Sequence, residues 1–169
     1  VTNLAATSLA NTSATVNGSI NPGGGTATAA SFIYSTVSSV DSGTTTVNLI
    51  ASQLNSLTGT NAVSVSAGLT GLGAGVVYYY YLTVTTQAGT FKSSILSFTT
   101  TPAPSASTSA ATSVTATSAI LNGVVNANNN ATTSIVFKYG TDSTLATGTS
   151  ITMPNVSGNL NTNETATVT

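Results

Sequence analysis

The chain has 169 residues, which is enough for one large domain or for two β-sandwiches of about 100 residues each. Charged residues make up 3% of the chain and its net charge is -1, so it lacks the clustered Lys and Arg with which proteins bind nucleic acid or anionic membranes. There is no Cys and no His, which excludes disulfides and thiolate metal sites and leaves the Ser and Thr hydroxyls without a general base. We therefore expect no enzyme activity and no cofactor, and we expect no membrane insertion because no apolar run approaches about 20 residues.

Period-2 alternation of apolar and polar residues predicts seven strands in the first 100 residues, with Gly and Asn at most of the breaks. We expect these strands at about residues 4–9, 13–20, 28–36, 44–51, 62–68, 77–87 and 90–100. The run Asn-Pro-Gly-Gly-Gly at 21–25 forms a turn, because proline fixes φ and the glycines permit positive φ.

The strand at 77–87 is the most distinctive of the seven. One of its faces is apolar, and the other carries Tyr79 and Tyr81, to which we assign either an interface between subunits or sugar stacking. An exposed cross-strand aromatic pair is the structural alternative. The predicted core consists of Val16, Phe32, Tyr34, Val63, Val65, Leu72, Tyr78, Tyr80, Leu82, Val84 and some of Ile95, Leu96 and Phe98.

Three residues ahead of and within this strand carry a fold signature. Leu72, Gly75 and Tyr78 have the spacing of the tyrosine corner of Greek-key sandwiches. The spacing resembles the Leu-x-Pro-Gly-x-x-Tyr signature of fibronectin type III domains, with Ala74 in the place of Pro. Together with Ser-Ala-Thr-Val-Asn-Gly-Ser-Ile-Asn-Pro-Gly-Gly at 13–24, it resembles the fibronectin type III-like repeats of large bacterial surface proteins. The resemblance implies an immunoglobulin-like sandwich located outside the cell or at its surface.

The chain also repeats itself. Residues 6–36 align without gaps on residues 111–141, at a constant offset of 105 positions. We therefore predict an all-β fold of two tandem immunoglobulin/fibronectin III-like Greek-key sandwiches, the second incomplete within this chain. The expected boundaries are 1–101 for the first sandwich, 102–109 for a Pro/Ser-rich linker and 110–169 for the second.

The second copy is expected to lack strands F and G. Residues 160–168 resemble 57–65, which places the last residue inside strand E. Two explanations stay open: the chain is a fragment of a longer repeat protein or its sequence is incompletely known, or strands from a neighbouring subunit complete the second domain by β-strand addition. In the second case Ile135, Phe137 and Tyr139 form the interface, although a single donated strand cannot replace both missing strands.

Several polar residues are candidates for chemistry. Asp41 and Asp142 follow the third strand of each copy and are either a Ca²⁺ site or solvated turn residues. Lys138 and Glu164 are candidate partners for an intramolecular isopeptide bond of the kind found in some bacterial pilin sandwiches, although Lys138 should face outward. The Asn-x-Ser/Thr glycosylation sequons are at Asn11, Asn17, Asn130, Asn155 and Asn163.

These features favour a structural function. Ser and Thr make up about a third of the chain, and a nearly uncharged surface of this kind is expected to self-associate or to carry glycans. We expect a non-catalytic subunit of an extracellular bacterial filament, pilus or surface fibre, with copies of itself and covalent glycans as partners. The alternative is a spacer or carbohydrate-binding module of a large adhesin or secreted polysaccharide-degrading enzyme.

Overall fold

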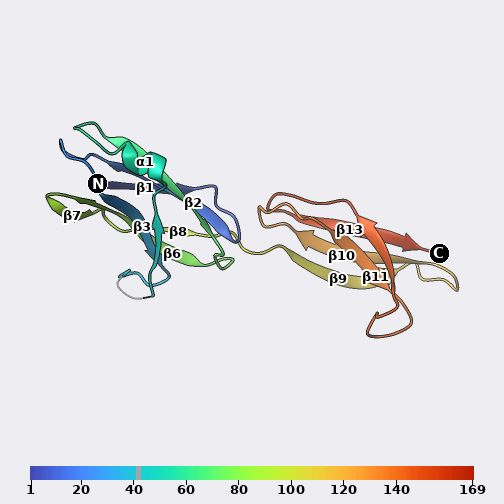
Figure 1. The fold of residues 1–169 in the computed structure, drawn as a ribbon. Coiled ribbons are helices and arrows are strands. Elements are labelled where there is room, and N and C mark those ends of the chain that lie inside the picture. The colour runs from blue at the N-terminus through green and yellow to red at the C-terminus, as the bar shows by residue number, and fades with distance from the viewer. Residues whose placement is uncertain (41–42) are drawn as a thin grey trace. The chain divides into compact units, whose positions relative to one another are not determined.

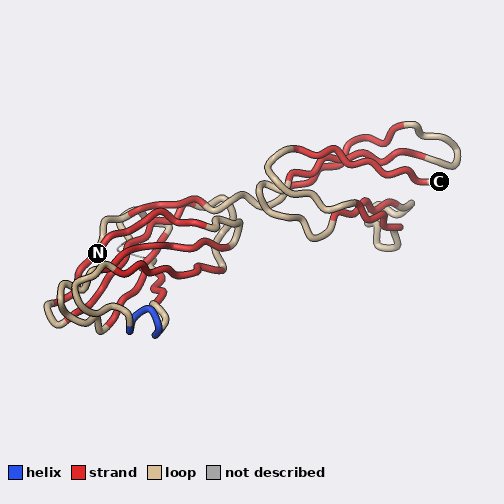
Figure 2. The backbone as a smooth tube through the Cα atoms, turned by 90° about the horizontal axis from the view of Figure 1, so that it is seen from above, coloured by secondary structure: helices blue, strands red, loops and turns tan. Residues whose placement is uncertain are grey.

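The computed structural model describes residues 1–40 and 43–169, and these fold almost entirely as antiparallel β-strands (Figure 1, Figure 2). The prediction of an all-β protein is confirmed. The chain divides into two compact units, Val1–Pro102 (unit 1) and Ala103–Thr169 (unit 2). Within the described residues, no helix has the length and apolar character needed to cross a membrane.

Unit 1 contains two sheets that enclose a core. The first sheet has the order β1-β2-β5 and consists of β1 (Thr2–Thr7), β2 (Ser13–Ile20) and β5 (Val63–Thr70). The second has the order β4-β3-β6, with two further strands along the outer edge of β6. Its strands are β3 (Ala29–Ser35), β4 (Thr45–Asn48), β6 (Val77–Thr86), β7 (Gly89–Lys92) and β8 (Leu96–Thr99).

Strict alternation in β2 and β6 places one face of each strand in the core, as expected for a strand that packs on one side only. The predicted core residues that are buried are Val16, Phe32, Val65, Leu72, Tyr80, Leu82, Val84 and Phe98. Four more, Tyr34, Val63, Tyr78 and Leu96, are partly buried against this cluster. Ile95 is 44% exposed and lies outside it.

A glycine in β2 allows the two sheets to approach closely. A Cβ atom at Gly18 would lie 2.5 Å from Leu82 Cδ2 and 3.0 Å from the Thr2 carbonyl oxygen. Leu82 and Phe32 are both fully buried above this position. The glycine is therefore required by packing, since any side chain would displace the centre of the core.

Two elements of unit 1 differ from the prediction. The expected last strand is divided into β7 and β8, because Ser93 turns its hydroxyl into the ladder and accepts a hydrogen bond from the Leu82 N–H at 2.9 Å. A short helix, α1 (Ala51–Asn55), follows β4 at a place where only a strand end was expected. It brings Leu54 and the fully buried Leu57 against the core.

Unit 2 is built from five strands, and all of its residues are described. One sheet has the order β13-β10-β9, and β11 pairs with β12 in a separate hairpin. The strands are β9 (Ser105–Thr112), β10 (Ala119–Asn126), β11 (Ile135–Tyr139), β12 (Thr149–Met153) and β13 (Asn161–Val168). The predicted linker at 102–109 is wrong from Ser105 onward, because β9 pairs with β10 over that stretch and satisfies its backbone there.

The expected alignment of the last strand is also wrong. Leu69 pairs with Ala14 in unit 1, and Val168 pairs with Ala119 at the equivalent place in unit 2. Val168 therefore corresponds to Leu69, and β13 and β5 are each eight residues long. The similarity of Leu160 to Leu57 was misleading, since Leu57 is fully buried and Leu160 is 82% exposed.

Candidate functional site

The two units share details that make their equivalent positions certain. In unit 1, Asn17 Nδ2 donates to the Ala5 carbonyl oxygen at 2.9 Å and to Thr7 Oγ1 at 3.1 Å, across an irregularity in the β1–β2 register. In unit 2, Asn122 makes the same two bonds, at 2.9 and 3.1 Å, to the residues 105 positions further along. Each Asn thus satisfies a carbonyl that the bulge leaves outside the ladder.

A strand that is central in unit 1 has no counterpart in unit 2. In unit 1, β6 pairs with β3 from Ala29 to Ser35 and covers the core. In unit 2, β11, which is labelled in Figure 1, stands in the place of β3 and pairs only with β12. The other edge of β11 presents backbone groups that are available to a further strand.

The apolar side chains of unit 2 are correspondingly less buried. Phe32 is fully buried in unit 1, whereas its counterpart Phe137 is only half-buried. Val136 is 46% exposed, while its counterpart Ser31 is 8% exposed. The equivalent residues are thus present in both units, and it is the covering strand that differs.

A groove runs beside the open edge of β11. It has a volume of about 370 Å³, so it is far larger than a packing defect. We call it the β11 groove. It is lined by Pro104, Ser105, Ala106, Ser107, Thr108, Gly123, Val125, Thr132, Ser134, Ile135, Val136, Phe137 and Glu164.

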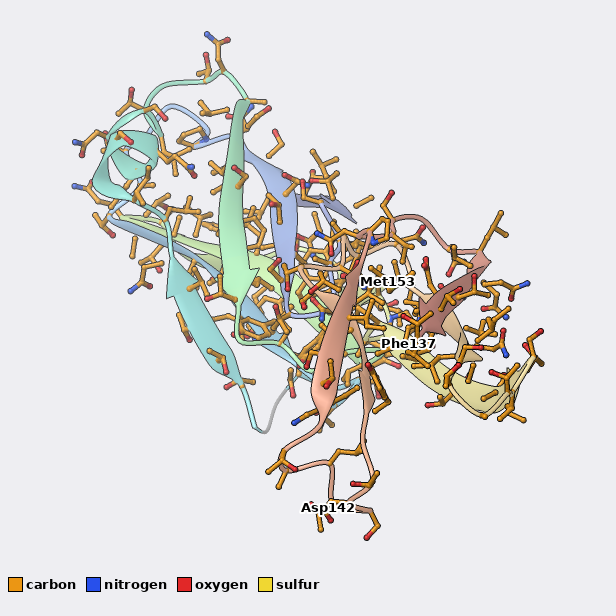
Figure 3. The ribbon with its side chains drawn as sticks, turned by 90° about the vertical axis from the view of Figure 1, so that its right-hand side faces the viewer. Phe137, Asp142 and Met153 are labelled. Atoms are coloured by element: carbon orange, nitrogen blue, oxygen red, sulfur yellow. The ribbon has the colours of Figure 1, made fainter. Side chains whose placement is uncertain are left out.

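The predicted interface residues lie in or beside this groove. Ile135 and Phe137 line it, and Tyr139 follows on the same face of β11; all three are half-buried. Figure 3 shows Phe137 and Met153 within the body of unit 2, whereas Asp142 lies at the tip of the loop that joins β11 to β12.

Glu164 is the one charged group in the groove lining. It pairs with Gly123 across the β10–β13 ladder, so its side chain points to the interior, and it is only 8% exposed. In unit 1 the residue paired with Gly18 is Val65, which belongs to the core. The carboxylate of Glu164 has no hydrogen-bond or ionic partner among residues 1–40 and 43–169.

The expected pairing of Lys138 with Glu164 is not formed. Lys138 is exposed and alternates with Phe137 along β11, so it lies on the outer face. Glu164 points into the groove on the opposite face of that strand. The geometry therefore gives no support to an isopeptide bond between them.

The outer tyrosines of β6 are less available than expected. Tyr79 and Tyr81 are both half-buried. Lys92 Nζ lies 5.0 Å from the centroid of the Tyr81 ring, in a cation–π contact that covers this ring. The arrangement does not leave the open pair of aromatic faces that sugar stacking requires.

The fold-signature residues form a defined corner. Tyr78 Oη accepts a hydrogen bond from the Gly73 N–H at 2.9 Å, while Leu72 is buried and Gly75 has a φ of +67°. The positive φ favours glycine at that turn. This is the geometry of a tyrosine corner.

A second, unpredicted contact joins the two sheets of unit 1. Asn3 is buried in β1, and its Nδ2 donates to the carbonyl oxygens of Tyr80 at 2.9 Å and of Ser94 at 3.3 Å. The Tyr80 hydroxyl donates to the Leu4 carbonyl oxygen at 2.5 Å. Burial raises the pKa of Tyr80, although a backbone hydrogen bond from Ala6 offsets part of this effect.

The glycosylation candidates differ in accessibility. Asn17 already uses its amide nitrogen at the β1 bulge, and Asn130 Nδ2 donates to the carbonyl oxygens of Asn128 and Ala127. Both predictions therefore conflict with existing hydrogen bonds. Asn11 is half-buried, whereas Asn155 and Asn163 are exposed.

No metal site is apparent. Asp142 is exposed and its carboxylate accepts hydrogen bonds from the hydroxyl and the N–H of Thr144, which lower its pKa. Asp41 lies outside the described residues. In the described part of the chain, no three His, Cys, Asp or Glu residues gather as a metal site needs.

Comparisons with known proteins do not assign the chain to a family. The sequence matches no protein-family model, and the comparison with curated proteins finds no match. The β11 groove and the internal repeat are the features of the chain that bear on its function.

Proposed function

We propose that the protein is a non-catalytic structural subunit of an extracellular bacterial filament, pilus or surface fibre, and that its subunits join by β-strand addition. The observation that carries this proposal is the β11 groove, which has both apolar and polar lining residues and lies beside an open strand edge. Its equivalent in unit 1 is filled by β6. Strand addition supplies main-chain hydrogen bonds along the edge and fills the groove with alternate side chains.

The surface chemistry supports the same proposal. A net charge of -1 provides little electrostatic repulsion between copies, so close association of many subunits is not opposed. The sheet order of unit 1 and its tyrosine corner also agree with the resemblance to fibronectin type III-like repeats of surface proteins. Covalent glycans are proposed at the two exposed sequons, Asn155 and Asn163.

The spacer function is the second candidate, because the chain contains two compact units in tandem. A carbohydrate-binding function has less support, since Tyr79 and Tyr81 are half-buried and Lys92 covers the Tyr81 ring. The filament proposal accounts for the β11 groove and the spacer proposal does not.

The test blocks the open edge without unfolding the strand. The Leu49 N–H donates a hydrogen bond to the Ala30 carbonyl oxygen, so the backbone N–H and C=O groups of Ala30 and of every second residue after it point to β4. The backbone N–H and C=O groups of the intervening Ser31 point to β6. At the offset of 105 residues, Val136 directs its N–H to the open edge of β11. Val136→Pro removes that donor at an edge position that tolerates proline, and Val136→Thr is the matched control that keeps it.

Electron microscopy and sedimentation velocity of purified protein provide the measurement. The wild type and Val136→Thr are expected to form filaments or ordered oligomers, and Val136→Pro is expected to remain monomeric with unchanged circular dichroism. A wild type that stays monomeric at high concentration, with unit 2 folded, would contradict the proposal.

A further inference from the structure

Each unit of the chain holds one Asn-Gly pair at the same repeat position. Asn17 and Gly18 lie in β2, Asn122 and Gly123 lie in β10, and no other Asn of the chain is followed by glycine. The fold requires both residue types. The Asn side chain satisfies a carbonyl at the bulge, and a Cβ atom at either glycine would lie less than 3.0 Å from a neighbouring atom. These two requirements place a reactive dipeptide in the central strand of each sheet.

The reaction to which this dipeptide is prone is deamidation, because glycine has no Cβ that keeps its nitrogen away from the preceding side chain. The Gly123 backbone nitrogen attacks Cγ of Asn122, the new N–Cγ bond closes a succinimide ring, and the Cγ–Nδ2 bond breaks. The proton of the attacking nitrogen leaves with Nδ2 as ammonia. Water then opens the ring at either carbonyl carbon: its hydroxyl stays on that carbon and its proton returns to the ring nitrogen. The products are aspartate and isoaspartate.

The folded strand suppresses this reaction. β10 pairs with β13 on one edge and with β9 on the other, so the Gly123 N–H lies within a ladder. Asn122 Nδ2 donates to the Ala110 carbonyl oxygen at 2.9 Å and to Thr112 Oγ1 at 3.1 Å, which holds the side chain against β9. The attack therefore requires β10 to leave its ladder, and its rate follows the free energy of that opening.

The two units differ in what opposes the opening. The buried core cluster of the described residues consists of unit 1 residues only, and Leu82 and Phe32 lie fully buried over Gly18. In unit 2, Gly123 lines the β11 groove, and its neighbour Phe137 is only half-buried. Burial of a single leucine side chain already changes an opening equilibrium by about tenfold or more. We therefore expect β10 to open far more often than β2.

We propose that Asn122–Gly123 is a site of spontaneous deamidation that becomes reactive when the sheet of unit 2 opens, and that Asn17–Gly18 is its protected counterpart. The product aspartate places a carboxylate oxygen, which cannot donate, opposite the Ala110 carbonyl oxygen. Isoaspartate adds a carbon atom to the main chain of β10 and breaks its register with β9 and β13. Each reaction prevents the sheet from closing again. It thereby limits the lifetime of an open unit 2, whatever the protein assembles into.

Both pairs can be measured in one experiment on the full chain. Purified protein is incubated in native buffer at mildly alkaline pH, which favours the attacking nitrogen, and a parallel sample is incubated in urea. After unfolding, tryptic cleavage at Lys92 and Lys138 places Asn17 and Asn122 in different peptides. Fragmentation mass spectrometry gives the extent of deamidation at each site, and chromatography separates isoaspartate from aspartate.

In urea the two sites are expected to react at similar rates, since the same dipeptide is free at both. In native buffer Asn122 is expected to react about tenfold or more faster than Asn17. Two matched variants change the rates separately. Phe137→Ala is expected to speed the reaction at Asn122 alone, and Phe32→Ala at the equivalent position is expected to speed it at Asn17 alone. A variant that unfolds its unit is expected to react at the rate measured in urea.

The consequence for the fold is measured on the deamidated chains, which anion exchange separates by their additional negative charge. Their NMR spectra are expected to lose the dispersed signals of unit 2 and to keep those of unit 1. Equal native rates at Asn17 and Asn122, or no native reaction at Asn122 when it reacts in urea, would overturn the inference. A rate at Asn122 that Phe137→Ala leaves unchanged, or deamidated chains in which unit 2 stays folded, would overturn it as well.

Discussion

The close approach of the two sheets at Gly18 predicts a large effect from a single methyl group. In Gly18→Ala the new Cβ would lie 2.5 Å from Leu82 Cδ2 and 3.0 Å from the Thr2 carbonyl oxygen. The oxygen belongs to a paired strand and Leu82 is fully buried, so neither can move freely. Overpacking of this kind costs about 1–3 kcal/mol, and each kcal/mol lowers the Tm of a domain of this size by about 4–8 °C.

A second glycine provides the matched control. A Cβ at Gly68 of β5 meets nothing within 4 Å, and its φ is not in the left-handed region. Gly68→Ala is therefore expected to leave unit 1 unchanged or to stabilise it by about 0.4–1 kcal/mol through the unfolded chain. Both substitutions add the same methyl group, and only the site differs.

The assay is thermal unfolding followed by tyrosine near-ultraviolet circular dichroism. This signal reports mainly on unit 1, which holds every tyrosine of the chain except Tyr139. We expect a clearly lower Tm for Gly18→Ala and a Tm equal to or above that of the wild type for Gly68→Ala. Equal Tm values for the two variants would refute the assignment of Gly18 to the centre of a packed core.

Three further predictions concern hydrogen bonds. Tyr80→Phe removes the bond to the Leu4 carbonyl and is expected to cost about 1 kcal/mol in urea unfolding near pH 8. Because burial raises the pKa of Tyr80 in the folded protein, its contribution to the free energy of unfolding is complete below the pKa of unfolded tyrosine, about 10, and is lost as the pH rises through the folded pKa. The difference in unfolding free energy between wild type and Tyr80→Phe should therefore narrow in alkali. A difference that stays constant with pH would contradict the burial of Tyr80. Thr144→Val is expected to raise the pKa of Asp142 toward its ordinary value in an NMR titration, and an unchanged midpoint would exclude the Thr144 hydroxyl as the cause. Asn122→Ala is expected to destabilise unit 2 by about 1 kcal/mol by chemical denaturation, and no loss would show that water replaces its bonds at the bulge.

Strand identity could be predicted from the sequence wherever alternation was strong. In β2 and β6 the apolar positions recur every second residue, and the structure buries that face of each strand. Periodicity could not locate the break at Ser93, because the break depends on a side-chain hydrogen bond to Leu82 in the neighbouring strand. It also missed Asn3, whose role requires knowing that β1 lies beside Tyr80.

The candidate site was only partly predictable. The internal repeat aligns Phe137 with the predicted core residue Phe32. Because the second copy lacks the strand that covers Phe32 in the first, the sequence predicted that Phe137 is not covered. The alignment of Leu160 on Leu57 concealed the position of Glu164, because it made Glu164 equivalent to a loop residue. The strand pairing shows that Glu164 is equivalent to the core residue Val65. In a segment rich in Asn and Thr, the register of β13 is determined by its pairing with β10, and sequence similarity alone does not reveal it.

Hydrogen exchange at the open edge of β11 tests the central claim most directly. In dilute monomeric protein, the amide of Val136 is expected to exchange rapidly, whereas the amide of its unit 1 counterpart Ser31, which β6 covers, is expected to be protected. In assembled protein, Val136 should become protected as a strand pairs with that edge. Protection of Val136 in the dilute monomer, or continued rapid exchange after assembly, would contradict the claim that the β11 groove is the place where subunits join.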